Sequence, residues 1–382
     1  MRRRLAVLLA VAAVFPAAAP AQTTAPPAAA ARAYLVANGA TGELLLDENA
    51  DARLPIASIT KLMTALVTLD HARPGERVTV GPLASSVGES SIHLRRGERM
   101  TIRDLLAAAL IQSANDATFA LAGHVGPDVR GFVRRMNRKA RALGLDDTHF
   151  VRPDGLDTPG HLSSAHDVFA LARAAMRKPL IRSLVRRDSA RIAGGRSLFA
   201  WNDLLGEYPG LIGVKTGHTD AAGWCQVAAA RRDGLTIYAV ILGSPMRARR
   251  NADLAKLLTW GFAQYARADV VDDERTYATA GVPFSDERLR LVAAEDVSAV
   301  VRLGRQLTEH VVAPSVVDLP VEAGEALGEV RVLEGDRVVA RRPLVAVEAV
   351  GEADFGERAR WYADRTLDEA AALVDDVLGA VS

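Results

Sequence analysis

Residues 54–64 read LPIASITKLMT, and within them Ser58 and Lys61 stand three positions apart. Apolar residues follow at the three- and four-residue spacing that predicts a helix with one buried face: Ile59, Leu62, Met63 and Leu66. Because positions three apart share a helix face, the Ser58 hydroxyl and the Lys61 amine are expected to lie within hydrogen-bonding range. Serine is a weak nucleophile that needs an adjacent base, and a lysine with a lowered pKa supplies one. Taken alone, the pair is also compatible with a solvated surface.

A second polar motif, Ser113-Ala114-Asn115-Asp116, lies between the apolar helical runs 105–111 and 117–122. A second hydroxyl at Ser113 would relay a proton between the lysine and a leaving group. The Asn115 carboxamide offers donors and an acceptor for a substrate amide. Taken alone, a polar stretch between two helices is also ordinary turn chemistry.

A third motif, Lys215-Thr216-Gly217-His218-Thr219, ends a predicted strand over residues 211–216. Gly217 has no side chain, so an extended substrate can come close and pair with the strand edge through its backbone. Lys215 and Thr216 supply a positive charge and a hydroxyl for a carboxylate. Taken alone, this motif is also compatible with an ordinary turn at the end of a strand.

Strand patterns stand on both sides of a helical region. The runs 33–37 and 43–47 predict a hairpin, and three later runs predict further strands over 211–216, 224–230 and 235–242. Helical spacing dominates from about residue 56 to 176, and another helix is predicted over 251–265. This order predicts an α+β fold, in which helices pack on a five-stranded antiparallel sheet.

The segments around this region predict further parts. A basic start, a short apolar run and Ala19-Pro20-Ala21 are typical of a secretory signal peptide over residues 1–21, with a leader at 22–30. The domain with the three motifs is expected to span residues 31–266. Valine-rich alternation predicts a small all-β domain over 267–350, and residues 351–382 are predicted to hold a helix.

The composition narrows the classes of function. A length of 382 residues with 49% hydrophobic side chains is typical of two globular domains rather than of a disordered chain. Lys and Arg number 47 against 46 Asp and Glu, and the net charge of +1 gives no indication of nucleic-acid binding. Cys225 is the only cysteine, which excludes an internal disulfide and a CxxC metal site, and we expect it to be a buried core residue.

The three motifs in this order and spacing are similar to the signature of penicillin-binding proteins and class A β-lactamases. Together with segments such as Ala222-Gly223 and 257–262, they resemble the low-molecular-mass penicillin-binding proteins, the serine D-alanyl-D-alanine carboxypeptidases. The resemblance covers about residues 33–350. It implies a penicillin-recognising, β-lactamase-like catalytic domain followed by a small β domain, with no metal and no cofactor.

The resemblance also implies a role for each motif residue. Ser58 would be the acylated nucleophile, Lys61 its general base and Ser113 the proton relay. Substrate binding would fall to a second set: Asn115, Lys215, Thr216, Gly217, His218 and Arg250. The backbone N–H groups of Ser58 and His218 would form the oxyanion hole. The implied substrate is the peptidoglycan pentapeptide, with β-lactams as covalent inhibitors, in the periplasm or on the outer face of the cytoplasmic membrane.

Three other functions share these motifs. A β-lactamase needs a deacylating glutamate between the second and third motifs, whereas residues 152–184 offer only Asp154, Asp157 and Asp167. A DD-endopeptidase that cuts peptide cross-links would use the same motifs, and an inactive peptidoglycan- or penicillin-binding module is the third alternative. The C-terminal helix is acidic, which weakens the case for an anchor on anionic lipid but leaves peripheral membrane contact open.

Overall fold

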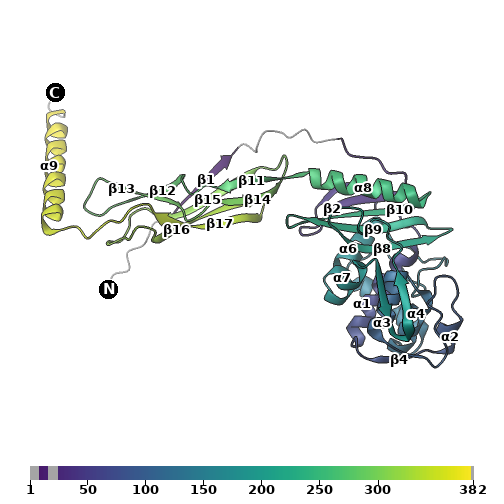
Figure 1. The fold of residues 1–382 in the computed structure, drawn as a ribbon. Coiled ribbons are helices and arrows are strands. Elements are labelled where there is room, and N and C mark those ends of the chain that lie inside the picture. Colours follow the sequence, from purple (N-terminus) through teal and green to yellow (C-terminus); the bar gives the residue numbers. More distant parts are fainter. Residues whose placement is uncertain (1–7, 16–24, 380–382) are drawn as a thin grey trace. The chain divides into compact units, whose positions relative to one another are not determined.

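The computed structural model describes residues 8–15 and 25–379, and side-chain burial for residues 25–367. The chain divides into two compact units, Thr24–Ala263 and Gln264–Ser382, the second of which includes the N-terminal strand (Figure 1). The domain limit that we expected after residue 266 falls within β11 (Tyr265–Val271), the first strand of the second unit after the N-terminal strand.

The first unit is built on an antiparallel sheet with the order β3-β2-β10-β9-β8 in the described part of the chain. Its strands are β2 (Ala33–Asn38), β3 (Leu44–Glu48), β8 (Leu211–Thr219), β9 (Gly223–Arg232) and β10 (Leu235–Ser244). The predicted five-stranded sheet is therefore confirmed. The strand that carries the third motif, β8, lies at one edge of this sheet.

The connection between β9 and β10 shows how the sequence sets the strand pairing. Asp233 and Gly234 form a two-residue loop in which both have positive φ, 47° and 81°. This is the combination that a type I′ turn needs, and its twist matches that of the two strands. The loop fixes the register in which Leu235 faces Arg232.

Helices pack on both faces of the sheet (Figure 1). On one face α8 (Arg247–Ala263) packs against β2, β9 and β10, and on the other α6 (Ala165–Met176) packs against β2 and β10. The helical region between β3 and β8 also contains the following elements: η1 (Ala57–Thr60), α1 (Lys61–His71), β4 (Arg77–Thr79), α2 (Pro82–Ser86), β5 (Arg99–Thr101), α3 (Ile102–Ala107), η2 (Ala108–Gln112), α4 (Asn115–Val125), α5 (Val129–Ala142), α7 (Pro179–Val185), β6 (Ser189–Ile192), η3 (Ala193–Gly195) and β7 (Arg196–Phe199).

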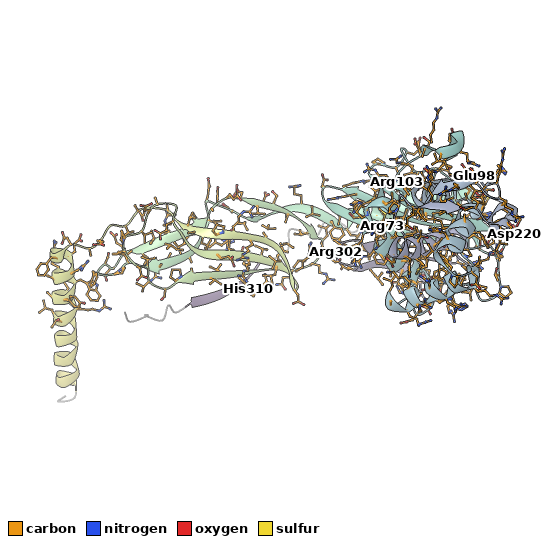
Figure 2. All side chains as sticks on the ribbon, turned by 90° about the horizontal axis from the view of Figure 1, so that it is seen from below. Arg73, Glu98, Arg103, Asp220, Arg302 and His310 are labelled. Atoms are coloured by element: carbon orange, nitrogen blue, oxygen red, sulfur yellow. The ribbon has the colours of Figure 1, made fainter. Side chains whose placement is uncertain are left out.

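The apolar stripe predicted after Ser58 forms part of the core. Ile59, Leu62, Met63 and Leu66 are each at most 1% exposed. Fully burying a side chain of this size contributes about 1.5–3 kcal/mol, so this stripe holds α1 firmly among its neighbours. The surface of the unit carries both charge signs, for example Arg73, Arg103 and Asp220 (Figure 2).

The second unit is the predicted all-β region. One sheet has the order β1-β15-β16-β17-β13-β12, and β11 pairs with β14. The bounds are β12 (Thr276–Gly281), β13 (Arg288–Ala293), β14 (Val297–Arg302), β15 (Leu307–Pro314), β16 (Ala326–Glu334) and β17 (Arg337–Ala346). Valines and leucines on alternate positions form its core, among them Val311, Val330 and Leu344.

The terminal segments extend this unit. Leu8–Phe15 forms β1 and pairs with β15. The expected cleavage site at residues 19–21 lies outside the described residues, and the signal peptide stays a prediction. The expected C-terminal helix is α9 (Phe355–Gly379). Among the helices of the described chain, none combines the length and the apolar character that crossing a bilayer requires.

Candidate active site

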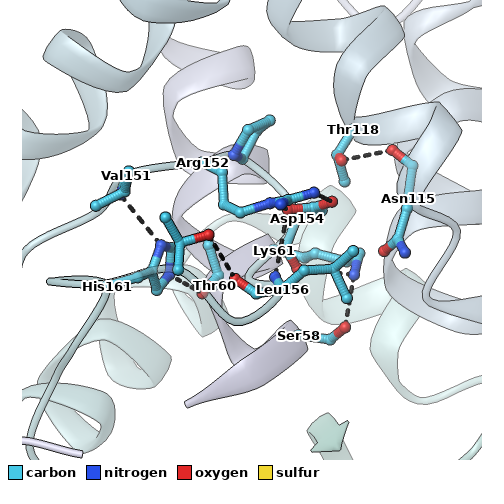
Figure 3. A network of polar contacts seen from close by, with 12 residues as sticks. Ser58, Thr60, Lys61, Asn115, Thr118, Val151, Arg152, Asp154, Leu156 and His161 are labelled. Atoms are coloured by element: carbon cyan, nitrogen blue, oxygen red, sulfur yellow. Dashed lines mark hydrogen bonds and ion pairs between the residues drawn. The ribbon is translucent and has the colours of Figure 1, made fainter. Parts of the chain in front are cut away.

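Ser58 lies in the tight turn η1, which leads directly into α1, and its hydroxyl faces Lys61 (Figure 3). The Lys61 amine donates a hydrogen bond to Ser58 Oγ at 2.6 Å and another to the backbone oxygen of Asp154 at 2.9 Å. Lys61 is fully buried, and burial lowers its pKa from 10.5 to about 8. A neutral Lys61 amine can accept the Ser58 proton, so the two have the geometry of a nucleophile and its base.

Two glycines allow other segments to approach the turn that presents Ser58. Ala57 has a φ of 48°, a left-handed conformation that costs a residue with a Cβ roughly 1–2 kcal/mol. Gly155 packs so closely that a Cβ there would lie 2.0 Å from the Ala57 oxygen. A Cβ on Gly217 would lie 2.9 Å from the Ser58 nitrogen. Both contacts require glycine and place β8 directly against the nucleophile.

The second and third motifs meet through Ser113 and Lys215. Lys215 Nζ donates to Ser113 Oγ at 3.0 Å and to the Thr216 backbone oxygen at 2.9 Å. Burial, together with the positive charges of Lys61 and Arg250, holds the pKa of Lys215 well below its ordinary value. Each of the two buried amines therefore has a serine hydroxyl as partner, and both pKa values are lowered.

Asn115 begins α4, and its backbone oxygen accepts the Thr118 hydroxyl (Figure 3). Its Nδ2 is 3.4 Å from the Gly88 oxygen, whereas its buried Oδ1 has no hydrogen-bond partner among the described residues. A buried amide oxygen without a partner is costly, and a substrate N–H would satisfy it. The next residue, Asp116, is structural, since its carboxylate accepts the backbone N–H groups of Ile92 and Leu94.

A cavity of about 300 Å³ lies over these groups. Its walls are formed by Ser58, Ser90, Ser113, Trp201, Thr216, Gly217, His218, Trp224 and Arg250. The candidate site residues that do not line it, Lys61, Asn115 and Lys215, are buried at 2% exposure or less. The structure thus brings together residues from α1, the start of α4, β8 and α8, which are far apart in the sequence.

Arg250 is the cation of this cavity. It is 1% exposed, and its guanidinium lies 5.7 Å from the centre of the Trp224 ring. Its Nη2 donates to Asn251 Oδ1 at 2.6 Å and lies 3.5 Å from Asp203 Oδ2. Burial lowers the pKa of Arg250 to about 10, so it stays charged at neutral pH. A fixed, desolvated guanidinium is a strong partner for a carboxylate.

A network of polar side chains, mostly buried, surrounds Lys61 on the side away from Ser58 (Figure 3). The Asp154 carboxylate accepts Arg152 Nε at 2.5 Å and Nη2 at 2.8 Å. His161 Nε2 lies 2.8 Å from Thr60 Oγ1, and the Val151 N–H donates to His161 Nδ1 at 3.1 Å. Nδ1 is therefore the acceptor, and burial lowers the pKa of His161 to about 4, which keeps the ring neutral.

Several residues of the site were not found by sequence reasoning. Trp201 and Trp224 line the cavity, and Asp154, which is paired with Arg152, contacts Lys61 through its backbone oxygen. Trp224 could have been predicted, because two adjacent strands joined by a short turn place it opposite His218 of the third motif. The structure shows this pairing, with the centres of the two rings 4.0 Å apart. Trp201 and Arg152 gave no such signal.

Other expected features concern Cys225 and metal binding. Cys225 is fully buried, as predicted, and burial raises its pKa to about 11. Within the described residues, one group of acidic side chains lies close enough to share a cation: Asp272, Asp273 and Asp296. All three are exposed, and such groups are common without a metal.

Comparison with known proteins gives a consistent set of relatives. A family model described as D-alanyl-D-alanine carboxypeptidase matches residues 20–246. The D-alanyl-D-alanine carboxypeptidase DacF of Bacillus subtilis is 30% identical over 328 residues, covering 82% of this chain and 84% of DacF. DacA of Escherichia coli is 30% identical over 345 residues, covering 85% of each chain. The crystal structure of penicillin binding protein 5 from Haemophilus influenzae has a TM-score of 0.63 and 27% identity, covering 86% of this chain and 100% of that one.

Proposed function

Because the chain belongs to the D-alanyl-D-alanine carboxypeptidase family, we propose that it is a serine hydrolase that removes the terminal D-alanine from peptidoglycan stem peptides. The observation that carries the proposal is the 2.6 Å contact between Ser58 Oγ and the buried Lys61 amine. This pair lies at a cavity that also contains a buried cation, Arg250, and the edge-strand residue Thr216.

In the first step, Ser58 Oγ attacks the carbonyl carbon between the two terminal D-alanines, and Lys61 takes the hydroxyl proton. The backbone N–H groups of Ser58 and His218 stabilise the resulting oxyanion. The C–N bond then breaks, and the departing D-alanine amine receives a proton from Lys61 through the Ser113 hydroxyl. In the second step water attacks the ester, which releases the shortened peptide and restores Ser58.

Substrate binding follows from the chemistry of the walls. The terminal carboxylate would lie between Arg250 and Thr216, with Lys215 behind them. The peptide backbone would pair with the outer edge of β8 beside Gly217, which lines the cavity, and Asn115 Oδ1 would accept a peptide N–H. β-Lactams would acylate the same serine and act as covalent inhibitors.

The test is release of D-alanine from a peptide that ends in two D-alanines, together with covalent labelling by a fluorescent penicillin. Wild type should do both, and Ser58→Ala should do neither. Ser86→Ala removes an exposed hydroxyl that does not line the cavity and serves as the matched control. A wild-type protein that is folded but not labelled would show that the site is an inactive binding module.

The two related activities predict different results. In a β-lactamase the acyl-enzyme breaks down quickly, but here residues 152–184 offer only three aspartates, whose carboxylates already accept hydrogen bonds. The Asp154 carboxylate accepts hydrogen bonds from Arg152, that of Asp157 from the Thr219 hydroxyl, and that of Asp167 from the Thr148 hydroxyl. Each of the three carboxylates also accepts a backbone N–H. We therefore expect a long-lived penicilloyl-enzyme. An endopeptidase would release products from cross-linked peptides at a rate similar to that from pentapeptide.

Export and membrane contact complete the proposal. The basic and apolar start of the sequence supports secretion to the periplasm or the outer face of the cytoplasmic membrane. We place any membrane contact at α9, where Trp361 and Tyr362 contact Phe284 of the same unit. The test is whether the mature protein pellets with membranes, and whether deletion of residues 357–382 releases it.

A further inference from the structure

We propose that Trp201 restricts the size of the amino acid that the site releases, so that a terminal D-alanine leaves far more readily than a D-amino acid with a long side chain. This inference rests on the proposed function and concerns its specificity.

Trp201 is a large apolar side chain that is half exposed and yet held in place. Its exposed fraction is 49%, although it lines the cavity. The indole Nε1 donates to the Gln112 backbone oxygen at 3.1 Å, and the Arg247 guanidinium lies 5.3 Å from the ring centre. An exposed aromatic ring that is fixed at both its edge and its face is suited to contact a ligand.

The residue after Trp201, Asn202, is hydrogen-bonded through its side chain to the strand behind the expected carboxylate site. Gln226 on β9 is paired in register with Thr216 on β8. The Gln226 amide donates to Asn202 Oδ1 at 2.8 Å, and Asn202 directly follows Trp201. The position of the indole is therefore coupled to that of Thr216.

Trp201 is also linked to Arg250, through Arg247 and Asp203. Arg247, which lies over the indole, is paired with Asp203 through two hydrogen bonds. The same carboxylate accepts Asn251 Nδ2 at 2.7 Å and lies 3.5 Å from Arg250. The indole and the Arg250 guanidinium thus belong to one braced wall, at the end of the cavity where a substrate carboxylate would bind.

The consequence concerns the side chain next to that carboxylate. If Arg250 and Thr216 hold the carboxylate of the leaving residue, the side chain on the same carbon lies against this wall. A methyl group fits there, whereas a long side chain must displace Trp201 or draw the carboxylate away from Arg250. Pockets that reject extra methylenes discriminate by about 10–200-fold, and a braced ring belongs in that range.

The experiment compares two acyl peptides that differ only in the last residue, D-alanine or D-lysine. The measured quantity is the ratio of their kcat/KM values, from release of the free amino acid. We expect wild type to prefer D-alanine by at least tenfold. Trp201→Ala should reduce this preference at least fivefold, and Trp201→Phe should reduce it less. Phe199→Ala, an exposed aromatic two residues away that does not line the cavity, should leave it unchanged.

The outcomes separate the two proposals. If wild type releases neither amino acid, the proposed function is wrong. If it releases D-lysine as fast as D-alanine, or if Trp201→Ala is labelled by penicillin and keeps the wild-type ratio, the function stands and Trp201 has no part in specificity. If Trp201→Ala fails to fold, the ratio in wild type and in Trp201→Phe decides the question.

Discussion

The Arg152–Asp154 ion pair beside Lys61 gives a prediction about the pH dependence of acylation. Lys61 has a pKa of about 8 instead of 10.5, mainly because it is buried. One unit of pKa corresponds to about 1.4 kcal/mol, so the lowered pKa favours the neutral amine by about 3 kcal/mol. At pH values below 8, the fraction of Lys61 that is neutral is therefore roughly 300-fold larger than for an ordinary lysine. Wild-type acylation should therefore rise about tenfold per pH unit up to about pH 8 and then level off.

The charges around Lys61 decide where that rise occurs. The Asp154 carboxylate raises the pKa of Lys61, as Glu89 and Asp116 also do, and the Arg152 guanidinium lowers it. Arg152→Met removes the opposing positive charge and leaves the buried Asp154 carboxylate unbalanced. We expect the inflection to move upward by about one pH unit, which slows acylation roughly tenfold at pH 7.

The assay is the rate of labelling by fluorescent penicillin from pH 5.5 to 9.5. Asp154→Asn should move the inflection below that of wild type, and the double variant Arg152→Met/Asp154→Asn should return it toward wild type. The double variant also controls for stability, since it leaves no unpaired buried charge. A variant that lowers the plateau without moving the inflection would refute the electrostatic account and assign Arg152 a purely geometric role.

Three further substitutions test the structure around the site. Lys61→Met should abolish acylation but stabilise the fold at pH 7 by about 1–3 kcal/mol in urea unfolding, since a buried ammonium is costly; equal or lower stability would contradict this. His161 has its pKa lowered to about 4, so stability should fall by about 3 kcal/mol as pH drops from 6.5 through 4, and His161→Gln should flatten that loss. Gly155→Ala should lower the free energy of unfolding by at least about 2 kcal/mol and remove most activity, because the new Cβ would clash with the Ala57 backbone oxygen. Gly144→Ala is the control: it has a φ of 69° but open space around it, and should lower the free energy of unfolding by about 1 kcal/mol. Equal losses of stability in the two variants would contradict the importance of the contact between Gly155 and Ala57.

The sheet and the three motifs were predictable because their signals are local. Continuous apolar runs and the Asp233-Gly234 turn define β9 and β10 without any knowledge of the rest of the fold. The spacing of Ser58 and Lys61 brings their side chains together on consecutive turns, as observed at 2.6 Å. The resemblance placed Ser113 and Lys215 in one site, but their direct hydrogen bond is seen only in the structure.

The support under Lys61 was not predictable, because it depends on contacts between distant segments. Arg152 and Asp154 are two residues apart and read as an ordinary polar loop. Only the close approach that Gly155 allows brings the Asp154 backbone oxygen to Lys61. Trp201 was missed for the same reason, since its role depends on a hydrogen bond to Gln112, 89 positions earlier. Sequence patterns describe the element on which a residue lies but not its partner.

The position of β8 at the edge of the sheet bears on how resistance to inhibitors could arise. A ligand held along that edge is recognised largely by amide and carbonyl groups, which every residue type possesses and which no codon change removes. Substitution within Lys215–Thr219 would also damage turnover of the natural peptide. Escape from a strand-mimicking inhibitor should therefore select changes in the surrounding walls, such as the aromatic ring at position 201, rather than in the strand itself.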